Sequence, residues 1–266
     1  MQTEKTLKNN SSFFSAVSDI KVMLGRSLKH IFKNLDQLMS LAIQPIMFML
    51  LFRYVFGGAI NTGGVTYVNF LVAGILIQMT AFGATTTSIS VATDVKRGII
   101  DRFKSLPIMS SAVMIGHVSA DLVRNTISSI VMIGVAFLVG FRPEANFLEW
   151  LIIWGIVMLF TFAFSWFSAI MGLLAKSVEA VQWMGFLFVF PLTFASSAFV
   201  PTDGMPKYLR IFAENQPVTH VIEAVRALMV GTPVGDHIFW SVIWCVGLTV
   251  VCIPLAGYMF RKKVSQ

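Results

Sequence analysis

Six long apolar runs constrain this sequence more than any other feature. A helix needs about 20 apolar residues to cross a bilayer, and only helices and closed barrels satisfy their backbone hydrogen bonds there. Only 12% of the residues are charged, about half the share usual in soluble domains. We therefore expect an all-α integral membrane protein with six transmembrane helices. The predicted spans cover residues 38–56, 67–91, 112–141, 148–175, 180–200 and 238–260.

Lysine and arginine predict the orientation of these spans, because cytoplasmic segments carry an excess of both. Placing the N-terminus inside puts 14 of the 20 basic residues on the cytoplasmic side, and the outer loop 57–66 has no charge. Six spans then leave both termini in the cytoplasm of a bacterial-type plasma membrane. We expect a cytoplasmic N-terminus (1–37), a six-span domain (38–260) and a cytoplasmic tail (261–266). Residues 1–35 have no early apolar core, which argues against a cleavable signal.

A short charged segment, 94–107, separates the second and third runs. Thr93 is expected to cap a helix over 94–106, and Pro107 to end it. About 12 residues span about 18 Å, too little to cross a bilayer of about 30 Å. Two interpretations stay open: an interfacial loop helix, or a helix on which a cytoplasmic motor docks. Its apolar residues share one helical face: Val95, Ile99, Ile100, Phe103 and Leu106.

Two further segments are amphipathic. Apolar residues recur every three or four positions over 13–35, with lysine and arginine between them. This pattern predicts a basic helix in the headgroup layer, although a soluble helix against a partner fits it as well. The segment 201–236 predicts two short helices, the first ended by Asn215 and the second starting at Pro217 and ended by Gly231. We expect these to be extracellular re-entrant or interfacial helices.

Catalytic chemistry has little support. The sequence contains no Gly-x-x-x-x-Gly-Lys-Ser/Thr loop, no His-Glu-x-x-His motif and no Gly-x-Ser-x-Gly motif. Cys245 and Cys252 are seven residues apart in one apolar run, so on a helix their Cα atoms are about 10 Å apart, too far for a disulfide. No spacing suits a metal. We expect no catalytic residues and no metal site.

Asp121 and Arg124 are the ionisable residues closest to membrane depth. At i, i+3 they can face each other on a helix. A charge in mid-bilayer costs about 2.5–3.5 kcal/mol, which favours a functional role. The alternative, which the late start of the strongly apolar part at Ile127 favours, is a self-neutralising pair at the cytoplasmic interface.

The end of the fifth run, FPLTFASSAFVP, mixes aromatic rings with hydroxyls. Small residues there favour close helix packing. The alternative is the wall of an exit path for an amphipathic substrate. Its candidate residues are Phe190, Pro191, Thr193, Phe194 and Ser197.

Five blocks carry a family resemblance. QPIMFMLLFRYVFGGAI (44–60), YVNFLVAGILIQMTAFGATTTSIS (67–90), RGIIDRFKSLPI (97–108), SADLVRN (119–125) and NQPVT (215–219) resemble ABC exporter permeases of the daunorubicin/doxorubicin drug-resistance type, which are type-two ABC exporter membrane subunits. The commoner form of the last block has Asn-Pro, so Gln216 is a departure from the family pattern.

The resemblance implies a permease that exports a hydrophobic or amphipathic substrate: a drug, an antibiotic or a lipid-like molecule. It implies a homodimer or a pair with a similar permease, surrounded by membrane lipids, without nucleic acid. A separate ABC ATP-binding subunit would hold ATP and Mg, and this chain no cofactor. The helix 94–106 would couple to that subunit, and Arg97, Asp101 and Arg102 would set the contact. The candidate coupling residues are Asp94, Arg97, Gly98, Ile100, Asp101, Arg102, Ser105, Leu106 and Pro107.

Two other functions stay open. An ion- or proton-driven carrier would use Asp121 and Arg124, and would work without ATP. A membrane-embedded enzyme is disfavoured, because no catalytic cluster is present.

Overall fold

The computed structural model describes residues 35–60, 62, 64–97, 110–175 and 177–264, and in these ranges it forms helices and no strand. The predicted amphipathic helix over 13–35 lies outside the described residues, apart from Leu35. In chain order the elements are α2 (Leu35–Leu51), the π-helix η1 (Phe52–Phe56), α3 (Tyr67–Lys96), α5 (Ser110–Val139), α6 (Phe147–Leu174), α7 (Val178–Phe194), the 3-10 helix η2 (Thr202–Gly204), α8 (Lys207–Asn215), α9 (Pro217–Val230) and α10 (His237–Val264).

In the part of the chain that the structure describes, four helices are long and apolar enough to cross a membrane: α3, α5, α6 and α10. Two shorter apolar stretches, Ile43–Phe56 and Val178–Phe194, fall where the first and fifth spans are expected. The helices confirm the all-α class and agree with the positions of the apolar runs. The count of six spans stays a prediction.

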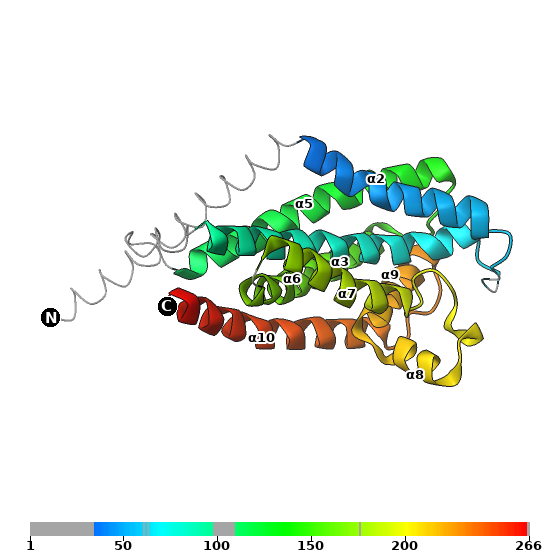
Figure 1. Cartoon of the computed structure of the whole chain (residues 1–266). Coiled ribbons are helices and arrows are strands. Elements are labelled where there is room, and N and C mark those ends of the chain that lie inside the picture. The colour runs from blue at the N-terminus through cyan, green and yellow to red at the C-terminus, as the bar shows by residue number, and fades with distance from the viewer. Residues whose placement is uncertain (1–34, 61, 63, 98–109, 176, 265–266) are drawn as a thin grey trace, which may run out of the picture.

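Helix α3 forms the centre of the bundle and packs against α2, α5, α6, α7 and α9 (Figure 1). In its most apolar stretch 83% of the residues are buried, against 17% in α10. A helix that is apolar on all sides is expected to be buried on all sides. By contrast, α10 leaves most of its apolar surface for lipid or for another chain.

Glycines set the closest helix contacts. A Cβ atom at Gly74 of α3 would collide with the backbone of Ala198, and one at Gly172 of α6 would collide with the backbone of Ser88. Small residues of this kind let helices approach without a polar anchor. They bring α3 against both α6 and the turn that follows α7.

The bundle has two ends (Figure 1). At one end, here called the α9 end, α8 and α9 lie beside the start of α10 and the end of α7. At the other, here called the basic end, α3 and α10 finish and α5 begins. Five basic residues of the described ranges belong to the ends of α3 and α10 at this end of the bundle: Lys96, Arg97, Arg261, Lys262 and Lys263.

Two predicted boundaries are wrong. A new helix does not begin at Asp94, because α3 continues to Lys96 and the Thr93 hydroxyl donates to the Ile89 carbonyl inside it, 2.7 Å away. The fifth apolar helix ends at Phe194 rather than at residue 200. There the chain turns, because the Ser196 hydroxyl bonds to the Thr193 carbonyl and to the Ala198 amide.

Candidate functional site

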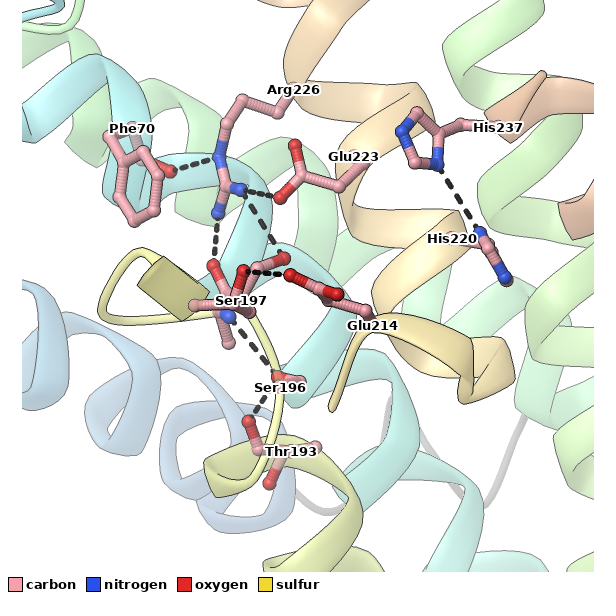
Figure 2. A network of polar contacts seen from close by, with 11 residues as sticks. Phe70, Thr193, Ser196, Ser197, Glu214, His220, Glu223, Arg226 and His237 are labelled. Atoms are coloured by element: carbon pink, nitrogen blue, oxygen red, sulfur yellow. Dashed lines mark hydrogen bonds and ion pairs between the residues drawn. The ribbon is translucent and has the colours of Figure 1, made fainter. Parts of the chain in front are cut away.

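Arg226 of α9 is a buried centre of polar contacts at the α9 end (Figure 2). Its Nε donates to the Phe70 carbonyl of α3 at 3.0 Å, and its Nη2 donates to the Ser197 carbonyl at 2.6 Å. Its Nη1 reaches Glu223 and, at 3.4 Å, the Ser197 hydroxyl. The guanidinium also lies 3.6 Å from the centre of the Phe70 ring. One side chain therefore joins α9, α3 and the turn after α7.

Two more side chains hold that turn. The Gln216 amide donates to the carbonyls of Leu192 and Ala195, at 2.9 and 2.6 Å. The Tyr67 hydroxyl donates to the Phe199 carbonyl at 3.0 Å. The last carbonyls of a helix lack partners within it, so Gln216 caps α7 from the start of α9. Gln216, which departs from the commoner Asn-Pro form, therefore has a structural role.

Phenylalanines join α7 to α2 and η1. The rings of Phe186, Phe190 and Phe194 follow one face of α7, with successive centres 4.9 and 4.1 Å apart. Phe194 continues to Phe199, 4.8 Å away, and Phe199 stacks on Phe52 of η1 at 4.5 Å. Such offset pairs stabilise beyond their buried area. We call this set the aromatic ladder: Phe48, Phe52, Phe186, Phe190, Phe194 and Phe199.

The predicted path residues fall into two groups that differ in burial. Phe190 and Pro191 are exposed on α7, and Phe194 is half-buried. Thr193 and Ser197 are buried, and their hydroxyls are used internally: Thr193 donates to the Val189 carbonyl, and Ser197 accepts from Arg226. Phe190 therefore faces outward and Phe194 packs partly inward, whereas the two hydroxyls are satisfied by groups of the protein.

Asp121 lies in the interior between α5 and α6, with none of its surface exposed. One carboxylate oxygen is 3.3 Å from Nη1 of Arg124, as the i, i+3 spacing predicts. The other accepts from the Ser165 hydroxyl of α6. Both oxygens thus have partners in the bundle. The preferred interpretation of an interfacial pair did not foresee this complete burial.

Asp94, in the last turn of α3, is joined to Nε2 of His117 of α5 at 2.9 Å. No local sequence pattern predicts this contact, because His117 is 23 residues away. Arg97 is exposed and caps α3. The other predicted coupling residues lie outside the described residues: Gly98, Ile100, Asp101, Arg102, Ser105, Leu106 and Pro107.

Two smaller clusters lie at the α9 end. Arg210 of α8 bonds to Glu214 at 2.6 Å and to Asp203 of η2 at 3.0 Å, and the hydrogen bond from Arg210 lowers the pKa of Glu214. His220 of α9 and His237 of α10 meet through their Nδ1 atoms, 3.2 Å apart. Burial, and then the neighbouring His237, lowers the pKa of His220.

The described residues contain no group of three or more His, Cys, Asp or Glu side chains that could hold a metal. Cys245 and Cys252 are buried, free thiols. The arrangement provides buried polar contacts that fix helices, and an exposed aromatic face.

Comparison with known proteins decides between the remaining classes. The family model for ABC-2 type transporters matches residues 18–230. The chain belongs to the ABC-2 type transporter family. It is 32% identical over 231 residues to "Daunorubicin resistance ABC transporter permease protein DrrB1" of Streptomyces coeruleorubidus, which covers 85% of this chain and 80% of that protein.

Other relatives agree with this assignment. "Probable doxorubicin resistance ABC transporter permease protein DrrC" of Mycobacterium tuberculosis is 28% identical over 229 residues, 81% of this chain and 79% of that protein. "Nodulation protein J" of Rhizobium leguminosarum bv. trifolii is 23% identical over 208 residues, 77% of this chain and 78% of that protein.

This ABC-2 type protein is therefore a multi-pass membrane permease subunit of an ABC transporter, and ATPase activity belongs to a separate ATP-binding subunit. The predicted family is confirmed. Sequence reasoning missed the central role of Arg226, because its backbone partners at Phe70 and Ser197 are distant in sequence.

Proposed function

We propose that the chain is the permease subunit of an ATP-driven exporter that moves a hydrophobic or amphipathic substrate, such as a drug, an antibiotic or a lipid-like molecule, out of the cell. The observation that carries this proposal is the exposed aromatic face of α7. Along it Trp183 is 74%, Phe186 50% and Leu187 69% exposed. The names of the two drug-resistance relatives agree with an apolar cargo.

A second permease, identical or similar, would complete the path. In one chain the ladder residues Phe186 and Phe190 are uncovered, and van der Waals packing against a second chain stabilises helix association within a bilayer. Two such faces opposite each other would give a passage with aromatic walls, which accept flat or aliphatic cargo without requiring hydrogen bonds. The six spans and the cytoplasmic position of both termini are part of this proposal.

The segment 94–106 would receive the push of the ATP-binding subunit, which holds ATP and Mg. The first residue of this segment, Asp94, contacts His117 of α5, which follows the segment in sequence. A force on the segment would therefore reach α3 and α5 together. Since α3 packs against α7, movement of α3 would shift the aromatic face.

Arg102→Glu tests the coupling. We expect the variant to insert normally and to bind or stimulate the ATP-binding subunit poorly, because a charge reversal opposes the proposed contact. The measurement is ATPase activity and cargo efflux in vesicles that contain both subunits. Lys207→Glu, the same charge reversal on exposed α8, is the matched control. Normal ATP-driven export by Arg102→Glu would refute the docking role.

Phe190→Ala tests the path. Phe190 stacks on both Phe186 and Phe194, so its loss interrupts the ladder at its middle. We expect export to fall about tenfold while basal ATPase activity is retained, since one lost aromatic contact is worth about 0.5–1.5 kcal/mol beyond its area. The control is Phe147→Ala, which removes a ring that is 77% exposed on α6. Equal losses in both variants would place the path elsewhere.

A further inference from the structure

A second apolar feature lies away from the aromatic ladder. A cavity of about 680 Å³ opens between α5, α6 and α10, within the range of about 300–1,000 Å³ usual for ligand pockets. Val118 of α5, Phe162 of α6 and Ile253 of α10 line its walls. None of the lining residues comes from α2 or α7, so the cavity is separate from the proposed export path.

The cavity changes from apolar to cationic along α10. Ile253 and Arg261 both line it, and eight residues correspond to about 12 Å of helix. Arg261 is exposed at the basic end, and no carboxylate among the described residues is in ion-pair contact with it. Within the described ranges, no aspartate or glutamate lines the cavity. An occupant with an apolar body and an anionic head therefore fits both parts of it.

Trp166 of α6 adds an aromatic side chain to the cavity wall. The residue is only 6% exposed, so the ring is held in place by its neighbours. Tryptophan is enriched at membrane interfaces, where lipid headgroups and acyl chains meet.

We propose that this cavity is a binding site for one anionic phospholipid. An acyl chain lies between α5 and α10 and packs against Trp166, and the phosphate pairs with Arg261. A basic residue near an anionic headgroup contributes about 1 kcal/mol. This role does not depend on the direction or the cargo of transport.

Other occupants fit less well. A free phosphate would leave the apolar wall empty. The basic segment 13–35, with Lys21, Arg26, Lys29 and Lys33, would bring like charge to Arg261. The proposal therefore commits to a lipid rather than to an ion or a segment of this chain.

Gly257 allows a direct test. It lines the cavity, and a Cβ built on it meets no atom within 4 Å, so Gly257→Leu fills the space without a backbone clash. Gly247→Leu is the matched control, because this glycine of the same helix also has open space and lies outside the cavity. Full-length protein in mild detergent is titrated with phosphatidylglycerol or phosphatidylcholine, and bound lipid is counted by native mass spectrometry.

We expect phosphatidylglycerol to bind the wild type and Gly247→Leu with one saturable site, and Gly257→Leu to lose that site. Arg261→Gln should weaken binding about fivefold and remove the preference for phosphatidylglycerol; Lys263→Gln, which changes the same charge outside the cavity, should keep it. Trp166→Ala, which removes the aromatic wall, should weaken binding about threefold and retain the preference.

Three results would overturn the proposal. Retention of the saturable site by Gly257→Leu, at a melting temperature equal to that of the control, would show that the lipid binds elsewhere. Equal affinity for phosphatidylglycerol and phosphatidylcholine would show that the site does not select an anionic headgroup. A change of oligomeric state in Gly257→Leu without a change in bound lipid would make the cavity an interface between chains.

Discussion

Two arginine–carboxylate ion pairs of the described residues have i, i+3 spacing, and they are buried in opposite ways. In the pair of α5 the carboxylate is the buried member: the Asp121 side chain is 0% exposed and that of Arg124 is 11% exposed. In the pair of α9 the cation is deeper: the Arg226 side chain is 8% exposed and that of Glu223 is 29% exposed.

The difference decides what each pair holds together. A carboxylate only accepts hydrogen bonds, and Asp121 accepts from Arg124 and Ser165, so it joins α5 to α6. A guanidinium has five N–H donors in a fixed plane. Arg226 uses them on two backbone carbonyls, a hydroxyl and Glu223, and so joins three segments. The second pair therefore constrains more of the fold.

Replacement of Arg226 should give the largest loss of stability. Arg226→Met leaves the carbonyls of Phe70 and Ser197 without this donor and Glu223 without its partner. Removing one partner of a buried pair costs about 3–5 kcal/mol, which corresponds to a fall of roughly 10 °C in melting temperature. The melting temperature can be measured with a thiol-reactive dye, because Cys245 and Cys252 are buried in the folded protein and become accessible on unfolding.

The matched variants sharpen this expectation. Glu223→Gln should cost less, because Glu223 is partly exposed and the backbone contacts of Arg226 remain. Arg226→Lys keeps the charge but cannot reach several acceptors in one plane, so it should fall between the two. If Arg226→Met melts no lower than Glu223→Gln, the contacts to the turn after α7 contribute little.

Local sequence signals predicted α9 well, but not the role of Arg226. Pro217 starts the helix and Gly231 ends it in the left-handed conformation, with φ of 75°, because both effects act within a few residues. Arg226 instead bonds to a carbonyl 156 residues away. Helical periodicity contains no information about such a partner, and the Ser197 carbonyl is accessible only because α7 ends at Phe194.

At Asp94 a local signal instead predicted a helix start that the structure does not have. Thr93 and Asp94 have the composition of a helix start, but they close the long helix α3. A capping signal competes with continuation of the preceding helix, and the threonine hydroxyl can bond back within the helix. Composition alone does not decide between the two, because the outcome depends on packing of α3 against its neighbours.

Neutralising Asp121 should have an intermediate effect. Asp121→Asn keeps the size of the side chain but removes the charge opposite Arg124, and a buried hydrogen bond to a charged group contributes about 1.5–3 kcal/mol. We expect the melting temperature to fall about half as far as in Arg226→Met. The double variant Asp121→Leu with Arg124→Met should recover most of this loss, since apolar replacement of a whole buried pair is often neutral.

The same variant separates the two transport mechanisms. If Asp121 serves packing, Asp121→Asn that reaches the membrane should still export its cargo in an ATP-dependent manner. Transport that stops in this variant, at unchanged protein level and without any dependence on ATP, would instead favour the ion- or proton-driven carrier.

The smallest effect is expected from the histidines at the α9 end, where stability should depend on pH. The pKa of His220 is lowered in the folded protein by burial and by His237, so near and below the ordinary pKa of about 6.5 the unfolded chain binds more protons. Stability is then complete above that value and decreases as the pH falls through it.

His220→Gln should therefore reduce the difference in melting temperature between pH 7.5 and pH 5.5. His237→Gln should do so less, because His237 is the secondary cause of the shift. An unchanged difference in the double variant would mean that acid destabilises the bundle elsewhere, and that the contact between α9 and α10 does not respond to protons.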